Sequence, residues 1–295
     1  MANLDPSTLG VSLLPMTSID DSQFNLKTIL NSLEKLPPST RLLCLPENSL
    51  YFNLDKTPIP KSAAFSKDSP EIIELLKQAQ EKNIYIHIGG IPWWIEGEVY
   101  NEALLLTPQG EIKETYEKLH LFDVELGPGI EICESKSYKA GNRLNTFEVD
   151  GWKIATCICY DLRFPELFIH YMENESVDAF LVPAAFTTKT GKTHWKSLLV
   201  ARAIETQSFV LAPAQVGYHR DSKQEKLRKS WGQSLVIGPW GRVLEETSSF
   251  EDFLDSCLTD HQPINTVLRK VDMESYRKSI PVSQHRKFLM ELKRK

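Results

Sequence analysis

The chain has 295 residues, and a composition of 41% hydrophobic and 25% charged residues excludes an intrinsically disordered protein. A formal net charge of −5 argues against nucleic acid or an anionic membrane as a partner, because both require a basic surface. Five scattered cysteines give no disulfide framework, and neither a secretory leader nor an apolar run of about 20 residues is visible, so we expect a cytoplasmic protein with free thiols.

The first third of the chain alternates buried strands with amphipathic helices. Short apolar runs predict strands at 9–14, 42–45 and 84–88. One helix is expected to begin at Asp21, a residue type that caps helix N-termini well, and a second at Ser69, which Pro70 follows in the first helical position.

Hairpins and further alternating elements are expected in the rest of the chain. The hairpins join 100–106 to 111–117, and 144–149 to 152–157. The second hairpin has Asp150-Gly151 at its turn, which favours type I′ geometry. Helices are expected from Pro165 and at 195–206, and strands at 179–182, 209–212, 234–237 and 242–246.

Two segments, 187–193 and 219–229, have the composition of loops. With these loops, the pattern predicts one α/β domain over 1–295, with mixed sheets and helices on their outer faces. Its core is expected at about 9–286, followed by a basic tail at 286–295.

The most informative segment is 151–167, GWKIATCICYDLRFPEL. An apolar strand leads into Cys159, and a turn at this point can expose the sulfur near the start of a helix, where backbone amides favour the thiolate. Cys157 would face the same side in a regular strand, so Cys159 is selected by its place at the turn. Alone, the signal is weak, because a buried strand cysteine is usually a small hydrophobic residue. Asp161 and Arg163 are expected to form an ion-pair network that fixes the turn, and the alternative is that Arg163 holds a carboxylate of the substrate.

Two charged residues elsewhere strengthen this interpretation. Glu47 directly follows a short apolar strand, and Lys118 lies at the end of the first hairpin. Each alone would be read as an ordinary solvated charge. A carboxylate, an ammonium and a thiol together make one of the standard sets for nucleophilic hydrolysis.

These motifs resemble the nitrilase superfamily of carbon–nitrogen hydrolases over about 9–286. The family's catalytic glutamate matches Glu47 in LPEN, its lysine matches Lys118 in YEKLHLFD, and its nucleophile matches Cys159 in CICYDLRFPEL. A second glutamate of many members matches Glu134 in CESKS. Finer motifs such as ARAIETQ and APAQVGYH resemble the deaminated glutathione amidase branch, to which the omega-amidases are close. The charged 219–229 insert departs from the family pattern.

The resemblance implies a four-layer α-β-β-α sandwich, usually joined as a homodimer, and an amidohydrolase acting on linear amides. Glu47 is expected as general base and Cys159 as the nucleophile that forms a thioester, with Lys118 and the backbone N–H of Tyr160 as oxyanion donors. Glu134 is expected to orient Lys118 or the water, or to form a structural salt bridge. No metal or cofactor is expected, since the sequence has no HExxH, GxSxG or paired CxxC motif.

The resemblance also implies a small anionic substrate. Deaminated glutathione, which would give 2-oxoglutarate and Cys-Gly, is the first expectation, and 2-oxoglutaramate is the alternative. Cationic or hydroxyl groups should then line the pocket, and Tyr51, Phe186, Thr187 and Lys189 lie in segments expected there. Two hypotheses of other kinds stay open: a non-catalytic interaction protein on this scaffold, and acyl transfer to an acceptor other than water.

Overall fold

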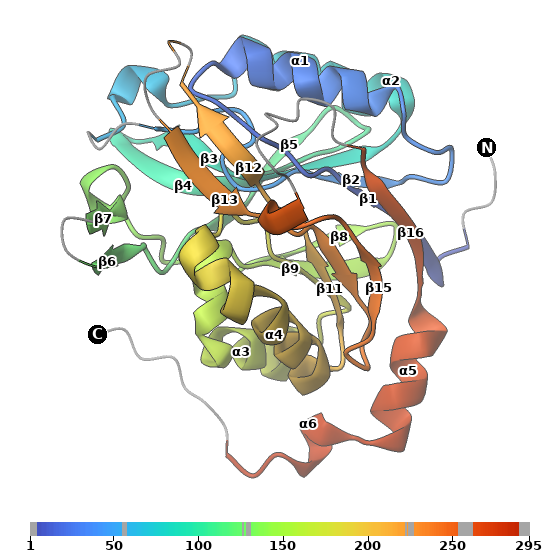
Figure 1. Ribbon diagram of the computed structural model, residues 1–295. Helices are drawn as coiled ribbons and strands as arrows, with labels where there is room; N and C mark the ends of the chain where they lie inside the picture. Colours follow the sequence, from blue (N-terminus) through green and yellow to red (C-terminus); the bar gives the residue numbers. More distant parts are fainter. Residues whose placement is uncertain are drawn as a thin grey trace.

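Two mixed β-sheets packed face to face form the centre of the molecule (Figure 1). The computed structural model describes residues 5–54, 58–125, 127, 131–221, 223, 227–252 and 262–288. The first sheet contains β1 (Thr8–Leu13), β2 (Leu42–Cys44), β3 (Tyr85–Ile95), β4 (Glu98–Leu106), β5 (Ile112–Glu117) and β16 (Ile264–Arg269). The second sheet contains β8 (Thr146–Val149), β9 (Trp152–Thr156), β10 (Ala179–Leu181), β11 (Phe209–Ala212), β14 (Leu235–Ile237) and β15 (Val243–Glu246).

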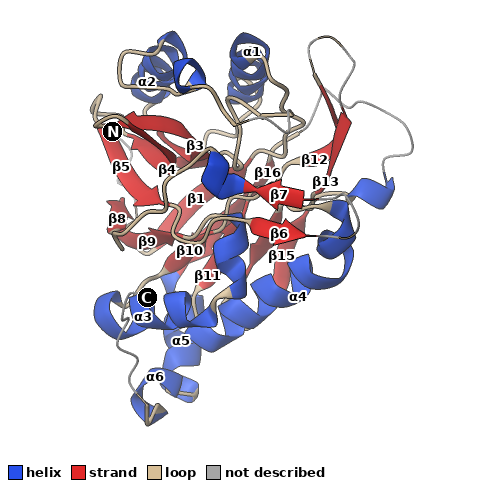
Figure 2. Ribbon diagram, turned by 90° about the vertical axis from the view of Figure 1, so that its left-hand side faces the viewer, coloured by secondary structure: helices blue, strands red, loops and turns tan. Residues whose placement is uncertain are grey.

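Helices cover the outer faces of both sheets. The α-helices are α1 (Ser22–Leu33), α2 (Pro70–Lys82), α3 (Pro165–Glu175), α4 (Thr188–Thr206), α5 (Lys270–Ser279) and α6 (Val282–His285). In both ribbon views α1 and α2 lie on one side of the paired sheets, and α3 and α4 lie on the other (Figures 1 and 2). The predicted four-layer α-β-β-α sandwich is therefore confirmed. No helix in the described part of the chain has the length and apolarity needed to cross a membrane.

Shorter elements complete the chain. Two small antiparallel pairs lie outside the main sheets, β6 (Asp123–Glu125) with β7 (Glu131–Cys133), and β12 (Val216–Arg220) with β13 (Leu227–Trp231). The 3₁₀ turns are η1 (Lys61–Ala63), η2 (Glu134–Lys136), η3 (Cys159–Arg163) and η4 (Phe250–Asp252).

Strand alternation explains how the interior forms. Leu9, Val11 and Leu13 of β1 are fully buried and pack, across the space between the sheets, with Trp152 and Ile154 of β9. Successive strand residues point to opposite faces, so every second residue of β1 contributes to this layer. Burial of each such side chain stabilises the fold by roughly 1.5–3 kcal/mol, and the two sheets are held together by many of them.

The central strands of each sheet run parallel, which decides where polar groups gather. β1, β2 and β3 pair in parallel in the first sheet, as do β9, β10 and β11 in the second. The carboxyl ends of parallel strands lie at the same edge of a sheet, and ligands of α/β proteins bind at such edges. The segments that follow β2, β9 and β10 are consequently the first place to search for a site.

The predicted turns and helix starts are mostly confirmed. The Asp21 carboxylate accepts hydrogen bonds from the amides of Gln23 and Phe24, both at 3.0 Å, and so caps α1. Asp150 and Gly151 have φ of 48° and 82°, as a type I′ turn requires. The Ser69 hydroxyl differs from the prediction, since it accepts from the amide of Ser66 and makes no hydrogen bond to the first turn of α2.

The prediction of a loop at 187–193 is wrong, because α4 already begins at Thr188. Threonines and a glycine are poor helix formers, which is why the sequence indicates a loop there. Tertiary packing overrides this preference: Gly191 lies against the Trp231 side chain so closely that a Cβ would be 2.3 Å from its nearest atoms. Only glycine allows the first turns of α4 to pack on β13.

The loop predicted at 219–229 is also wrong at both of its ends. His219 and Arg220 belong to β12, and Leu227, Arg228 and Lys229 belong to β13, so the charged segment is the distal part of a hairpin. Residues 222 and 224–226 lie outside the described residues, as do residues 289–295 of the predicted basic tail. Arg286, where that tail begins, forms an ion pair with Glu173 at 3.4 Å.

A buried carboxyl group lies on the β4–β5 pair. Glu102 is 1% exposed, lies opposite Glu117, and has one carboxylate oxygen that makes no hydrogen bond to any described residue. Burial, together with the negative charges of Glu117 and Glu114, raises the pKa of Glu102 to about 8, although Arg143 and a backbone hydrogen bond from Tyr116 act in the opposite direction. Glu102 is thus held protonated in the folded protein at neutral pH.

We predict that Glu102→Gln removes a pH dependence of stability. The folded pKa exceeds the unfolded one, so the native state binds the extra proton, and stability falls as pH rises from about 4.5 to about 8. The wild type should lose up to about 1.4 kcal/mol per pH unit relative to the variant. Urea unfolding of both proteins at about pH 6 and about pH 8 measures this difference. Parallel pH profiles would show that Glu102 titrates normally.

Candidate active site

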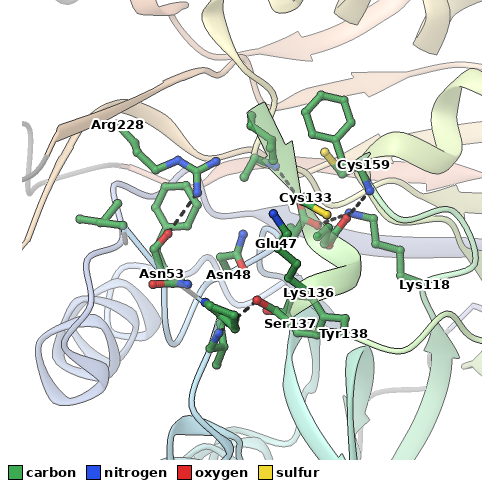
Figure 3. Close-up of a pocket in the computed structure, with 18 of the residues that line it drawn as sticks. Glu47, Asn48, Asn53, Lys118, Cys133, Lys136, Ser137, Tyr138, Cys159 and Arg228 are labelled. Carbon is green, nitrogen blue, oxygen red and sulfur yellow. Dashed lines mark hydrogen bonds and ion pairs between the residues drawn. The ribbon is translucent and has the colours of Figure 1, made fainter. Parts of the chain in front are cut away.

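A cavity of about 730 Å³ opens at the edge of the sandwich where the parallel strands end (Figure 3). Glu47 follows β2, Cys159 follows β9 and Ala185 follows β10, and all three line this cavity. Lys118, directly after β5, and Glu134, in η2, line it too. The structure therefore brings together four side chains that are up to 112 residues apart in sequence.

The Lys118 ammonium lies between two carboxylates. Its Nζ donates to Glu47 Oε1 at 2.8 Å and to Glu134 at 2.9 Å, and the Lys118 residue is 2% exposed. Burial alone would lower the pKa of Lys118, but the charges of Glu134 and Glu47 outweigh burial and raise it well above its usual range. Lys118 is consequently a permanent cation that faces the cavity.

Cys159 stands at a turn with an unusual backbone conformation. Its φ is +50°, a left-handed value that non-glycine residues adopt rarely. The turn separates the two neighbouring cysteines: Cys159 is partly exposed and lines the cavity, whereas Cys157 is fully buried in the core under α3 and α4. A regular strand would have placed both on one face.

The Cys159 thiol would need a base in order to form a thiolate. Burial and the charge of Glu47, together with a hydrogen bond to that carboxylate, raise the pKa of Cys159 well above its usual range. Lys118 and the amide of Ala185 act in the opposite direction without cancelling this effect. The resting sulfur is thus protonated, with the Glu47 carboxylate beside it to receive the proton.

Asp161 fixes the turn, but not through the ion pair predicted with Arg163. Its buried carboxylate accepts from the amide of Ile158 at 2.9 Å and the hydroxyl of Tyr116 at 2.8 Å. It also accepts from the amide of His120 at 3.1 Å and lies 2.7 Å from His120 Nδ1. The prediction failed because partners distant in sequence fill all the positions around this carboxylate.

Arg163 instead points toward α4. Its Nη1 is 3.2 Å from His194 Nδ1, and its guanidinium lies 5.3 Å from the centre of the Phe186 ring. Phe186 and Thr187 line a smaller pocket beside the first, together with Cys159 and Tyr160. Two of the residues expected to bind substrate therefore lie next to the cysteine.

The other two expected binding residues lie elsewhere. Tyr51 is half-buried in an apolar cluster with Ile59, Val99 and Tyr138, and it does not line either described pocket. Lys189, in the first turn of α4, lines neither pocket. Among the described residues no group of three or more His, Cys, Asp or Glu side chains is placed to hold a metal ion.

Sequence reasoning missed Asn101, which ties the two carboxylates together. Its Nδ2 donates to Oε1 of Glu47 and Oε1 of Glu134, both at 3.0 Å, and the residue is 1% exposed. The amide of Ala185 donates to the other oxygen of Glu47 at 3.0 Å. The available signal was that Asn101 and Glu102 stand directly before the apolar run at 103–106 of β4, since a buried amide needs partners.

An α-β-β-α sandwich with a buried carboxylate–ammonium pair beside a cysteine at a strand end is typical of hydrolases that attack with a thiol. The model of the carbon-nitrogen hydrolase family matches residues 11–274. The chain belongs to this family, and it is a hydrolase that acts on carbon–nitrogen bonds other than peptide bonds. The predicted membership in the nitrilase superfamily is confirmed.

Individual relatives agree with this placement. The chain is 34% identical over 286 residues to a deaminated glutathione amidase of Dictyostelium discoideum, which covers 94% of this chain and 93% of that protein. It is 32% identical over 288 residues to the human deaminated glutathione amidase. This match covers 94% of this chain and 82% of the human protein. The crystal structure of the Caenorhabditis elegans NitFhit protein matches with a TM-score of 0.81 and 28% identity, over 95% of this chain and 65% of that longer one.

We predict that Asn101→Ala lowers kcat by about 10- to 100-fold with little change in KM. Asn101 does not line the cavity, so its loss should disturb the orientation of Glu47 and Glu134 rather than substrate binding. Steady-state kinetics on an amide substrate, with thermal unfolding as a check on folding, measure this effect. Wild-type kcat in a folded variant would contradict a positioning role for this amide.

Proposed function

We propose that this hydrolase cleaves the amide of a small α-keto acid through a thioester on Cys159. The observation that carries the proposal is the Glu47 carboxylate, held by Lys118 at 2.8 Å, Asn101 at 3.0 Å and Ala185 at 3.0 Å, next to the Cys159 thiol. A fixed base beside a partly exposed sulfur is the arrangement that nucleophilic catalysis requires.

The first half of the reaction forms the thioester. Glu47 takes the proton of Cys159 as Sγ attacks the amide carbon, and the carbonyl oxygen becomes an oxyanion. The ammonium of Lys118 and the backbone N–H of Tyr160 receive this charge, and the loss of one such donor typically costs about 10²–10³-fold in rate. The C–N bond then breaks, and the leaving nitrogen takes the proton from Glu47.

The second half releases the acid. A water molecule gives its proton to Glu47 and attacks the thioester carbon, and the same oxyanion donors stabilise the second tetrahedral intermediate. The C–S bond breaks, the proton returns from Glu47 to sulfur, and Cys159 is regenerated. In this scheme Glu134 holds Lys118 in place through its own hydrogen bond to the ammonium, at 2.9 Å.

The names of the relatives support deaminated glutathione as the substrate, with 2-oxoglutarate and Cys-Gly as products. The alternative is 2-oxoglutaramate, which would release ammonia. A side-by-side comparison of kcat/KM on the two compounds discriminates between them. The cytoplasmic location and the homodimer implied by the resemblance stay predictions.

Two hypotheses of other kinds have distinct tests. A non-catalytic interaction protein would show no acyl adduct and no product with any amide, although its Glu47, Lys118 and Cys159 are all present. Acyl transfer would use the same thioester with another acceptor. Formation of a hydroxamate in the presence of hydroxylamine measures how accessible the thioester is to such acceptors.

We predict that Cys159→Ala lowers turnover by at least about 10³-fold while the protein still folds. Intact-mass measurement after mixing with substrate should show an acyl adduct on the wild type and none on the variant. Peptide mapping should place the adduct on Cys159 rather than on Cys133, which lines the same cavity.

The matched control is Cys157→Ala, which removes a thiol two residues away. Cys157 is buried in the core, so its loss should lower stability modestly and leave the acyl adduct intact. Full activity of Cys159→Ala, or an adduct that maps to another residue, would overturn the proposed mechanism.

A further inference from the structure

Two cationic side chains of the cavity, Lys136 and Arg228, have no role in the mechanism. The cations that line the cavity are Lys118, Lys136 and Arg228. Lys118 is paired with two carboxylates, and Lys136 forms an ion pair with Glu131 at 3.4 Å. Arg228 has no carboxylate partner within 4 Å among the described residues, so its charge is available to a ligand.

The guanidinium of Arg228 is held in place by contacts that leave most of its donors unused. Its Nη1 donates to the carbonyl oxygen of Asn53 at 3.0 Å, and the guanidinium carbon lies 5.0 Å from the centre of the Phe52 ring. A guanidinium has five N–H donors, and this is its one hydrogen bond within the described part of the chain. The side chain is therefore ordered in advance, which reduces the entropy lost on binding an anion.

Arg228 lies where the two pockets beside the cysteine meet. Arg228, Cys159, Phe122 and Ala185 line both of them. In Figure 3, Arg228 enters from the side opposite Lys118, and Glu47 and Cys159 lie between them. A substrate whose carbonyl carbon is next to Cys159 thus has Lys118 at its reacting end and Arg228 toward the rest of the molecule.

We propose that Arg228 binds a carboxylate of the amide substrate and makes the enzyme selective for acidic amides. This inference rests on the proposed function and extends it to the group that recognises the acid. A guanidinium binds a carboxylate through two parallel hydrogen bonds, and such charge-assisted bonds are the strong ones. Arg228 supplies the cationic group that the sequence analysis assigned to Lys189, which lines neither pocket.

The test compares glutaramate, which has a carboxylate in its acyl part, with pentanamide, a neutral amide of the same chain length. We expect the wild type to have a higher kcat/KM on glutaramate than on pentanamide. Arg228→Gln should lower kcat/KM on glutaramate by about 10- to 100-fold and change kcat/KM on pentanamide by less than about threefold. Arg228→Lys should restore part of the selectivity. N-pentanoylglycine, with its carboxylate in the leaving group, tests whether the recognised acid lies on that side instead.

Lys229→Gln is the matched control, because it removes the same charge one residue along β13. Its side chain lies over the rings of Tyr218 and Phe250 and outside both pockets. Selectivity should stay within about twofold of the wild type in this variant, since screening weakens an exposed charge at a distance. A comparable loss in Lys229→Gln would assign the effect to the general field of the hairpin and contradict the proposal.

A binding measurement keeps the inference independent of turnover. Calorimetric titration of glutarate into Cys159→Ala and into the same protein with Arg228→Gln should show a Kd about 10- to 100-fold weaker in the double variant. Equal Kd values, or equal losses of kcat/KM on glutaramate and pentanamide, would show that Arg228 only ties β13 to Asn53. Failure of the wild type to hydrolyse any amide would contradict the proposed function instead.

Discussion

The Lys118 ammonium, buried between Glu47 and Glu134, is the interaction on which the whole site depends. Two carboxylates 3 Å or less from one ammonium would repel each other without it. Removal of one partner from a buried charge network typically costs about 3–5 kcal/mol, because the remaining charge has lost its compensation. The Asn101 amide supplies a further donor to both acids. The site is accordingly one electrostatic unit, built from a strand end, a hairpin end and a 3₁₀ turn.

The backbone turn at Cys159 determines where the sulfur points. A cysteine at the end of a buried strand would normally stay inside the core, as Cys157 does. The left-handed conformation at Cys159 turns the chain so that the sulfur faces the cavity, and Asp161 holds that turn through its bonds to Ile158, Tyr116 and His120. The strain of this conformation is offset by these hydrogen bonds, of which those from Ile158 and Tyr116 are fully buried.

Local patterns predicted most of the fold. Strand alternation, the Asp150-Gly151 turn and the capping residue Asp21 are properties of short segments, and the structure has each of them. The start of α4 could not be predicted in this way, because Gly191 depends on Trp231, forty residues later in the chain. The charged hairpin likewise forms by pairing between β12 and β13, which the polar composition of the segment conceals.

The candidate site likewise contains residues that local sequence predicts and residues that only the folded chain reveals. The candidate residues Glu47, Lys118, Cys159 and Glu134 were recognisable because each lies in a motif that resembles the family's, and the structure brings them together. Asn101 and Arg228 have no such motif in the sequence, and their significance comes from distances to residues on other strands. Tyr51 and Lys189 were chosen from neighbouring segments, but the direction of a side chain is set by packing that only the folded chain reveals.

Arg228 lies on a different sheet from the strands that precede Glu47 and Cys159, which has an evolutionary consequence. Cys159 and Glu47, the proposed nucleophile and base, follow strands of the two large sheets, whereas Arg228 belongs to the β12–β13 pair, which within the described residues shares no ladder with either sheet. Replacements in β12 or β13 can thus alter how a substrate carboxylate is recognised while the proposed catalytic groups keep their geometry. Divergence of specificity among relatives of this protein should concentrate there.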